Sequence, residues 1–112
     1  MVFASGKATF YPDQFPEKFN REKKRNNYEE FVAQMQSKGI NTIDFNSWFK
    51  SKKGKTPFSL YTELGIHWTL YGSSLAFDSI AKWVEKKRNI DMPDYLIDKY
   101  EFPDELRSPD DD

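Results

Sequence analysis

With 112 residues, the chain is long enough for one domain that buries a modest hydrophobic core. Its 17 Lys and Arg residues are balanced by 18 Asp and Glu residues, and the net charge of -1 removes the usual electrostatic argument for nucleic acid or an anionic membrane as the principal partner. The absence of Cys excludes disulfides, thiolate metal sites and a Cys nucleophile. The aromatic fraction of 17% predicts a core built largely from rings.

The first half of the chain is predicted to form a β-α-β unit. Residues 1–4 are a short apolar run, typical of a strand. Residues 40–45 contain two Ile and a Thr, the composition of a second strand. Between them, residues 27–38 are predicted to be helical, with Asn27 as N-cap and Gly39 as the C-terminal stop. The apolar residues at the spacing of one helical face are Tyr28, Phe31, Val32 and Met35.

Two more helices are predicted downstream. A short one over residues 46–52 follows Asp44, whose carboxylate either caps it or acts at the carboxyl edge of the sheet, where open α/β sheets bind ligands. Thr69 is the predicted N-cap of a long helix from about Leu70 to Arg88, ended by Asn89 and Pro93. Its expected apolar stripe contains Ala76, Ile80, Trp83 and Val84, broadened by Leu75, Phe77 and Ala81. The Lys and Arg runs are interpreted as solvated or helix-stabilising charge, so we expect no nucleic-acid partner.

His67 is the only histidine, and it lies two residues before the predicted long helix. Imidazole titrates near neutral pH and can take a proton from a hydroxyl nucleophile, so a His held by a rigid element is a natural general base. On residue chemistry alone, a structural role for His67 is about equally well supported.

The residues around His67 resemble a known family. Residues 60–69 have the sequence LYTELGIHWT, and Gly72 and a Leu-Ala pair at residues 75–76 follow them. This pattern is similar to that of SGNH-hydrolase-like proteins of the AlgX and AlgJ type, which O-acetylate alginate and other exopolysaccharides. In that family a Tyr-rich segment precedes an Asp-x-His-Trp-Thr motif, and a Gly and a Leu-Ala pair follow it. Residues 42–45 resemble the family's preceding strand, and residues 88–94 resemble Bacteroidetes-type versions.

The resemblance implies an α/β fold, namely a partial three-layer unit of SGNH or flavodoxin-like type with a short parallel sheet and flanking helices. We expect this SGNH-like domain over residues 1–90, and an acidic, Pro-containing tail or docking segment over residues 91–112. The family's nucleophilic Ser, in a Gly-Asp-Ser-type motif, comes much later than the His. This chain ends before such a motif, so we expect it to be an internal part of a larger parent chain.

The resemblance also assigns site residues. His67 is the expected catalytic base, and the family's Asp two residues earlier orients the imidazole. Here that position is Gly65, so Asp44 is assigned as the substitute acid, with Glu63 as the alternative. The motif residues expected to bind substrate are Tyr61, Trp68 and Thr69, although packing is the first role expected of Trp68.

The leading hypothesis is a fragment of an acyltransferase or esterase that acts on O-acetyl groups of a cell-envelope polysaccharide and is inactive alone. A non-catalytic carbohydrate-binding or assembly module is the alternative, and a small nucleic-acid-binding domain is the weakest. We expect an acetylated sugar or polysaccharide as partner, together with the rest of the parent chain, and no cofactor, metal or membrane span. An envelope or periplasmic location is implied by the resemblance alone.

Overall fold

The computed structural model describes residues 1–4, 6–19, 25–94, 97 and 99. The chain divides into two compact units, Met1–Lys53 and Gly54–Asp112, which are described separately. Within the described residues, no helix is long and apolar enough to cross a membrane. The run of charged residues at 21–25, one of the Lys and Arg runs, and the expected acidic tail over residues 91–112 fall largely outside the described residues.

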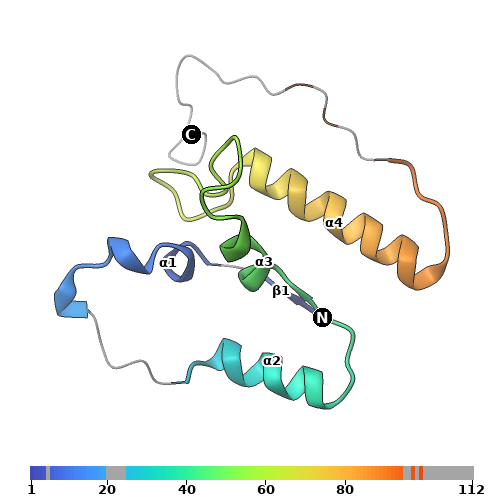
Figure 1. The fold of residues 1–112 in the computed structure, drawn as a ribbon, viewed down its shortest axis with the longest axis horizontal. Helices are drawn as coiled ribbons and strands as arrows, with labels where there is room; N and C mark the ends of the chain where they lie inside the picture. The colour runs from blue at the N-terminus through green and yellow to red at the C-terminus, as the bar shows by residue number, and fades with distance from the viewer. Residues whose placement is uncertain (5, 20–24, 95–96, 98, 100–112) are drawn as a thin grey trace. The chain divides into compact units, whose positions relative to one another are not determined.

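Unit 1 contains a two-stranded parallel sheet with helices around it (Figure 1). Strand β1 (Val2–Phe3) pairs with β2 (Ile43–Asp44), with Val2 opposite Ile43 and Phe3 opposite Asp44. The predicted α/β class with a short parallel sheet and flanking helices is therefore confirmed. The strands are shorter than predicted, and Phe45 begins helix α3 (Phe45–Lys52) instead of ending a strand, because the Asp44 side chain already caps that helix.

Helix α2 (Asn27–Ser37) connects the two strands, and its N-cap lies one residue earlier than predicted. Asn26, not Asn27, is the N-cap, because its side chain accepts the Glu29 N–H at 3.0 Å while the Glu29 carboxylate accepts the Asn26 N–H at 3.1 Å. The predicted stop is confirmed at Gly39, where φ is +63° and Ile40 N–H donates to Met35 O at 2.9 Å.

The core of unit 1 is aromatic, as the composition predicts. Phe10, Phe45 and Phe49 are at most 3% exposed, and the rings of Phe45 and Phe49 lie 6.0 Å apart in an edge-on arrangement. Phe10 lies in the short helix α1 (Lys7–Phe10), which packs on α3. Lys53 ties the two together by donating to Phe10 O at 3.1 Å. Two 3-10 turns follow α1, at Pro12–Gln14 and Glu17–Phe19.

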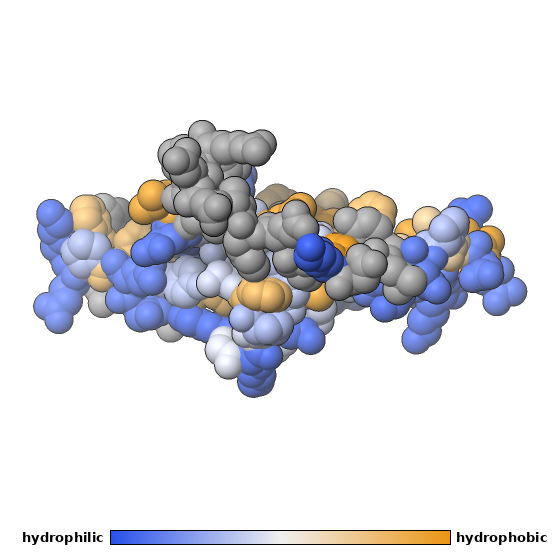
Figure 2. Space-filling view, turned by 90° about the horizontal axis from the view of Figure 1, so that it is seen from above, coloured by the Kyte–Doolittle hydropathy of each residue, from blue (hydrophilic) through white to orange (hydrophobic). Residues whose placement is uncertain are grey.

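The described part of unit 2 contains a looped segment followed by α4 (Leu70–Arg88), whose predicted bounds, Thr69 cap and Asn89 end are confirmed. Asn89 adopts the left-handed conformation with φ of 51°. The predicted apolar stripe is only partly buried, since Ala76 is 3% exposed but Phe77 is 55% exposed. Exposed apolar side chains occur in both units, Phe31 of α2 among them, and Figure 2 shows orange hydrophobic residues among blue hydrophilic ones on one face.

Candidate functional site

The segment that carries His67 folds back on itself ahead of α4 (Figure 1). Tyr61 and Trp68 form an isolated antiparallel bridge. Inside it, the Thr62 N–H donates to the His67 carbonyl at 3.3 Å, and the Thr62 hydroxyl reaches the same oxygen at 3.4 Å. Thr62 is 1% exposed, so the His67 backbone is held by a buried neighbour. His67 itself is exposed.

Thr69 joins this loop to the long helix. Its hydroxyl donates to the Ser59 carbonyl at 2.7 Å and accepts the Gly72 N–H at 3.0 Å, so one side chain closes the loop and caps α4. The Thr69 N–H also donates to the Leu60 carbonyl at 3.1 Å. His67 is thereby anchored on both sides, to Thr62 across the loop and through Thr69 to a helix of 19 residues.

The structure explains why the motif has a glycine at position 72. A Cβ at this position would lie 2.5 Å from the Leu60 carbonyl oxygen, closer than any side chain tolerates. The absence of a side chain lets the first turn of α4 lie against the backbone that pairs with Thr69. The His-Trp-Thr-x-x-Gly pattern therefore encodes a rigid connection between loop and helix, in which Thr69 supplies the hydrogen bonds and Gly72 the space.

The acid expected beside His67 is missing from its family position, which is Gly65, and Gly65 is buried. Glu63 is exposed and belongs to the same loop, next to the Thr62 that pairs with His67. Asp44 belongs to unit 1 and His67 to unit 2, so the expected pairing of Asp44 with His67 stays a prediction.

Asp44 caps α3 and also links three elements of unit 1. One carboxylate oxygen accepts the Ser47 N–H at 3.1 Å, and the other accepts the Tyr28 hydroxyl at 2.6 Å. The Tyr28 hydroxyl also lies 3.0 Å from the Ser47 hydroxyl. Partial burial opposes ionisation, but the hydrogen bonds from Tyr28 and Ser47 outweigh it and lower the pKa of the Asp44 carboxyl below its ordinary value. Asp44 is therefore an anion at neutral pH and a weak base.

The sequence did not predict the role of Tyr28, which was placed on the apolar face of α2 for its ring. The ring does pack, edge-on against Phe3 at 5.9 Å, while the hydroxyl reaches Asp44. The signal available in the sequence for this bond was a Tyr in the first turn of a predicted helix, together with an Asp at the end of a predicted strand.

The expected substrate-binding residues differ in access. Tyr61 is 2% exposed and Thr69 is 9% exposed, whereas Trp68 is partly exposed. The described residues include no group of three or more His, Asp or Glu side chains placed to hold a metal. Substrate binding by Tyr61, Trp68 and Thr69 stays a prediction.

Comparison with protein families gives a match over residues 1–98 to the SGNH hydrolase-like domain of acetyltransferase AlgX. The match includes both units' described secondary structure and the whole loop that carries His67. Comparisons with curated proteins and with solved structures give no match.

Proposed function

The chain belongs to the SGNH hydrolase-like domain family of acetyltransferase AlgX, and from that premise we propose that it is the histidine-bearing part of an acyltransferase or esterase acting on O-acetyl groups of a cell-envelope polysaccharide. The observation that carries this proposal is the anchoring of His67. Its backbone is bonded to buried Thr62, it lies two residues before a 19-residue helix, and the residue is exposed.

In this proposal the His67 imidazole takes the proton of a serine hydroxyl as the oxygen attacks the acetyl carbonyl, and returns it to the leaving group. The serine belongs to another part of the parent protein, and the 112-residue chain alone has no turnover, since a base without its nucleophile forms no acyl-enzyme.

Two acids are candidates to orient His67. Glu63 is supported by its place in the same loop. Asp44 is supported by its ionised carboxylate at the end of β2, although both of its oxygens already accept a hydrogen bond. An orienting carboxylate holds the tautomer of the imidazole and stabilises its protonated form, and its loss costs up to about 10⁴-fold in turnover.

The test is an acetyl-ester hydrolysis and acetyl-transfer assay of the parent protein with His67→Ala, Glu63→Gln and Asp44→Asn variants. We expect His67→Ala to lower kcat by at least about 10²-fold. One of the two acid variants, Glu63→Gln or Asp44→Asn, should also lower kcat, and that result identifies the orienting acid. Ser73→Ala, an exposed position on α4, is the matched control and should leave kcat unchanged.

A second candidate function is a non-catalytic carbohydrate-binding or assembly module, favoured by the glycine at position 65 where the family has its acid. Full activity of the His67→Ala parent would reject the catalytic proposal and leave this one. Turnover by the isolated chain, abolished by His67→Ala, would instead show that no further serine is needed.

A further inference from the structure

The most exposed large apolar residues that the structure describes lie beside His67. Ile66 is 76% exposed, Leu70 is 75% exposed and Leu64 is 69% exposed. All three lie within three positions of His67 in the sequence. Single exposed apolar residues are ordinary on a protein surface, whereas several close together mark a surface that meets a protein or a membrane.

Leu64 and Ile66 form the tip of the loop that carries His67. The loop turns between Thr62 and His67, which are joined by the bonds from Thr62 to the His67 carbonyl. Gly65 is buried, so the tip has an exposed apolar residue on each side of a buried glycine. Because these bonds close the loop and Thr69 connects it to α4, the tip has its shape before any partner arrives.

The segment around this apolar tip carries almost no charge. Between Lys55 and Asp78 the sequence has one charged residue, Glu63, whereas Asp, Glu, Lys and Arg make up 31% of the whole chain. Moving a charged group into lipid is costly, so a segment that enters a bilayer surface must be poor in charge. The segment has no Lys or Arg to attract anionic headgroups. Its charge pattern therefore fits a zwitterionic lipid surface.

Aromatic residues flank the apolar tip. Phe58 is 37% exposed and packs edge-on against Tyr71 at 5.3 Å, and Tyr71 and Trp68 are partly exposed. Tyr and Trp are enriched where proteins meet the membrane–water interface, because each has an apolar ring and a polar group. A protein partner would instead need a pocket for the protruding pair, and Leu is under-represented among the residues that dominate protein–protein affinity. These features favour lipid over a protein.

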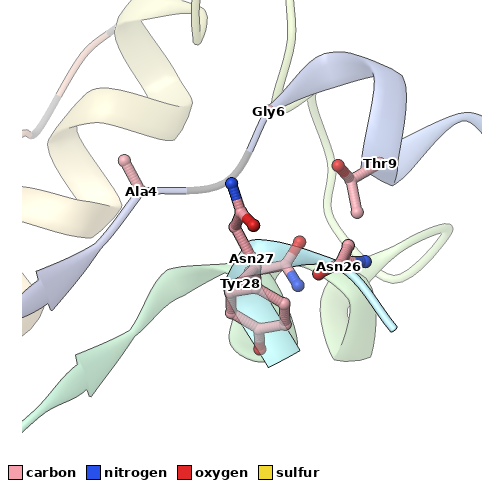
Figure 3. Close-up of a pocket in the computed structure, with 7 residues that line it drawn as sticks. Ala4, Gly6, Thr9, Asn26, Asn27 and Tyr28 are labelled. Atoms are coloured by element: carbon pink, nitrogen blue, oxygen red, sulfur yellow. The ribbon is translucent and has the colours of Figure 1, made fainter. Parts of the chain in front are cut away.

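The cavity of unit 1 has a different character. Its described lining includes Thr9, Asn26 and Asn27, and Figure 3 shows their polar side chains around it. Covering such groups with lipid would remove water from them without offering hydrogen bonds in return. An apolar phase therefore has its match at the tip of the His67 loop and not at this cavity.

We propose that Leu64 and Ile66 insert into the interfacial region of a zwitterionic lipid bilayer and hold the His67 loop at the membrane surface. The driving force is the apolar surface of the tip that leaves water on insertion. Glu63 and His67, which flank the tip, stay at the level of the hydrated headgroups. The binding does not rest on the proposed function, whereas the presentation of His67 to substrates at a membrane surface does.

The test is co-sedimentation of the chain with phosphatidylcholine vesicles. Two aliphatic residues bury less surface than a myristoyl chain, for which the association constant is about 10⁴ M⁻¹, so we expect a value on the order of 10³ M⁻¹. The double variant Leu64→Ser, Ile66→Ser should weaken binding at least about tenfold. A nitroxide-labelled lipid in the vesicles should broaden the backbone amide NMR signals of Leu64 and Ile66 in the ¹⁵N-labelled chain and leave those of α2 unchanged.

The matched control is Phe31→Ser, Ile40→Ser, which removes two exposed apolar residues of unit 1 and should bind normally. His67→Ala should also bind normally, so failure of the catalytic proposal would not remove this one. Adding anionic phosphatidylglycerol should not strengthen binding. The inference is overturned if the chain does not bind, if binding requires anionic lipid, or if the Leu64→Ser, Ile66→Ser variant binds as the unmodified chain does. Self-association that this variant abolishes, without vesicle binding, would assign the tip to a second copy of the chain instead.

Discussion

Replacing Gly72 by Ala tests whether the loop that carries His67 is held by close backbone contact with α4. In an open helix, Gly→Ala stabilises by up to about 1 kcal/mol because Ala has the higher helix propensity. At position 72 the new Cβ would lie 2.5 Å from the Leu60 carbonyl oxygen, so the backbones must separate by about 0.9 Å to reach an ordinary contact of 3.4 Å. The Leu60 oxygen also accepts the Thr69 N–H at 3.1 Å, and the same displacement stretches that bond.

Overpacking against backbone costs about 1–3 kcal/mol, which exceeds the gain in helix propensity. We therefore expect Gly72→Ala to lower the free energy of unfolding by about 1–2 kcal/mol, or the melting temperature by roughly 5–10 °C. Urea and thermal unfolding followed by circular dichroism at 222 nm measure this. The control is Ser73→Ala, one position along the same turn and exposed, which should be neutral or slightly stabilising. A Gly72→Ala chain as stable as Ser73→Ala would refute the close-contact explanation of this glycine.

Three further substitutions have defined outcomes. Asp44→Ala should lower the free energy of unfolding by about 2 kcal/mol at pH 7, with a smaller loss for Tyr28→Phe. The pKa of Asp44 is lower in the folded chain, so this stabilisation is present above the unfolded pKa of about 3.9 and is lost as pH falls through the folded pKa. The free energies of unfolding of the unmodified chain and of Asp44→Ala, measured in urea, should therefore converge in acid. Thr69→Val should cost about 1–2 kcal/mol in the same assay while Thr69→Ser costs little, and equal losses would argue against a role for the hydroxyl. Asn46→Leu should raise the free energy of unfolding by about 1 kcal/mol, because it removes a buried oxygen that has no hydrogen-bond partner among the described residues, and a loss of stability would mean that this oxygen is satisfied.

The sequence by itself determined the features that depend on neighbouring residues. The bounds of α4, its cap at Thr69 and its end at Asn89 were predicted because capping bonds span only three or four positions. The stop at Gly39 was predicted for the same reason, and capping of α3 was one of the two roles predicted for Asp44. The N-cap of α2 was predicted one residue too late. Asn26 and Asn27 each have a Glu three residues later, so the sequence allows a capping box at either residue. In the structure Glu30 forms an ion pair with Arg25 at 3.1 Å instead.

Only the tertiary structure decided the features that depend on distant partners. Strand length is one, since a strand extends only as far as its partner pairs with it, here over two residues. The contact of Gly72 with the Leu60 backbone and the bond from Tyr28 to Asp44 are others, because no local pattern specifies which groups meet across 12 or 16 positions. In the sequence, nothing distinguishes Asn46 from the other residues of the short predicted helix. Its burial at the edge of the sheet, where the amide oxygen has no partner among the described residues, follows from how β1, α2 and α3 pack together.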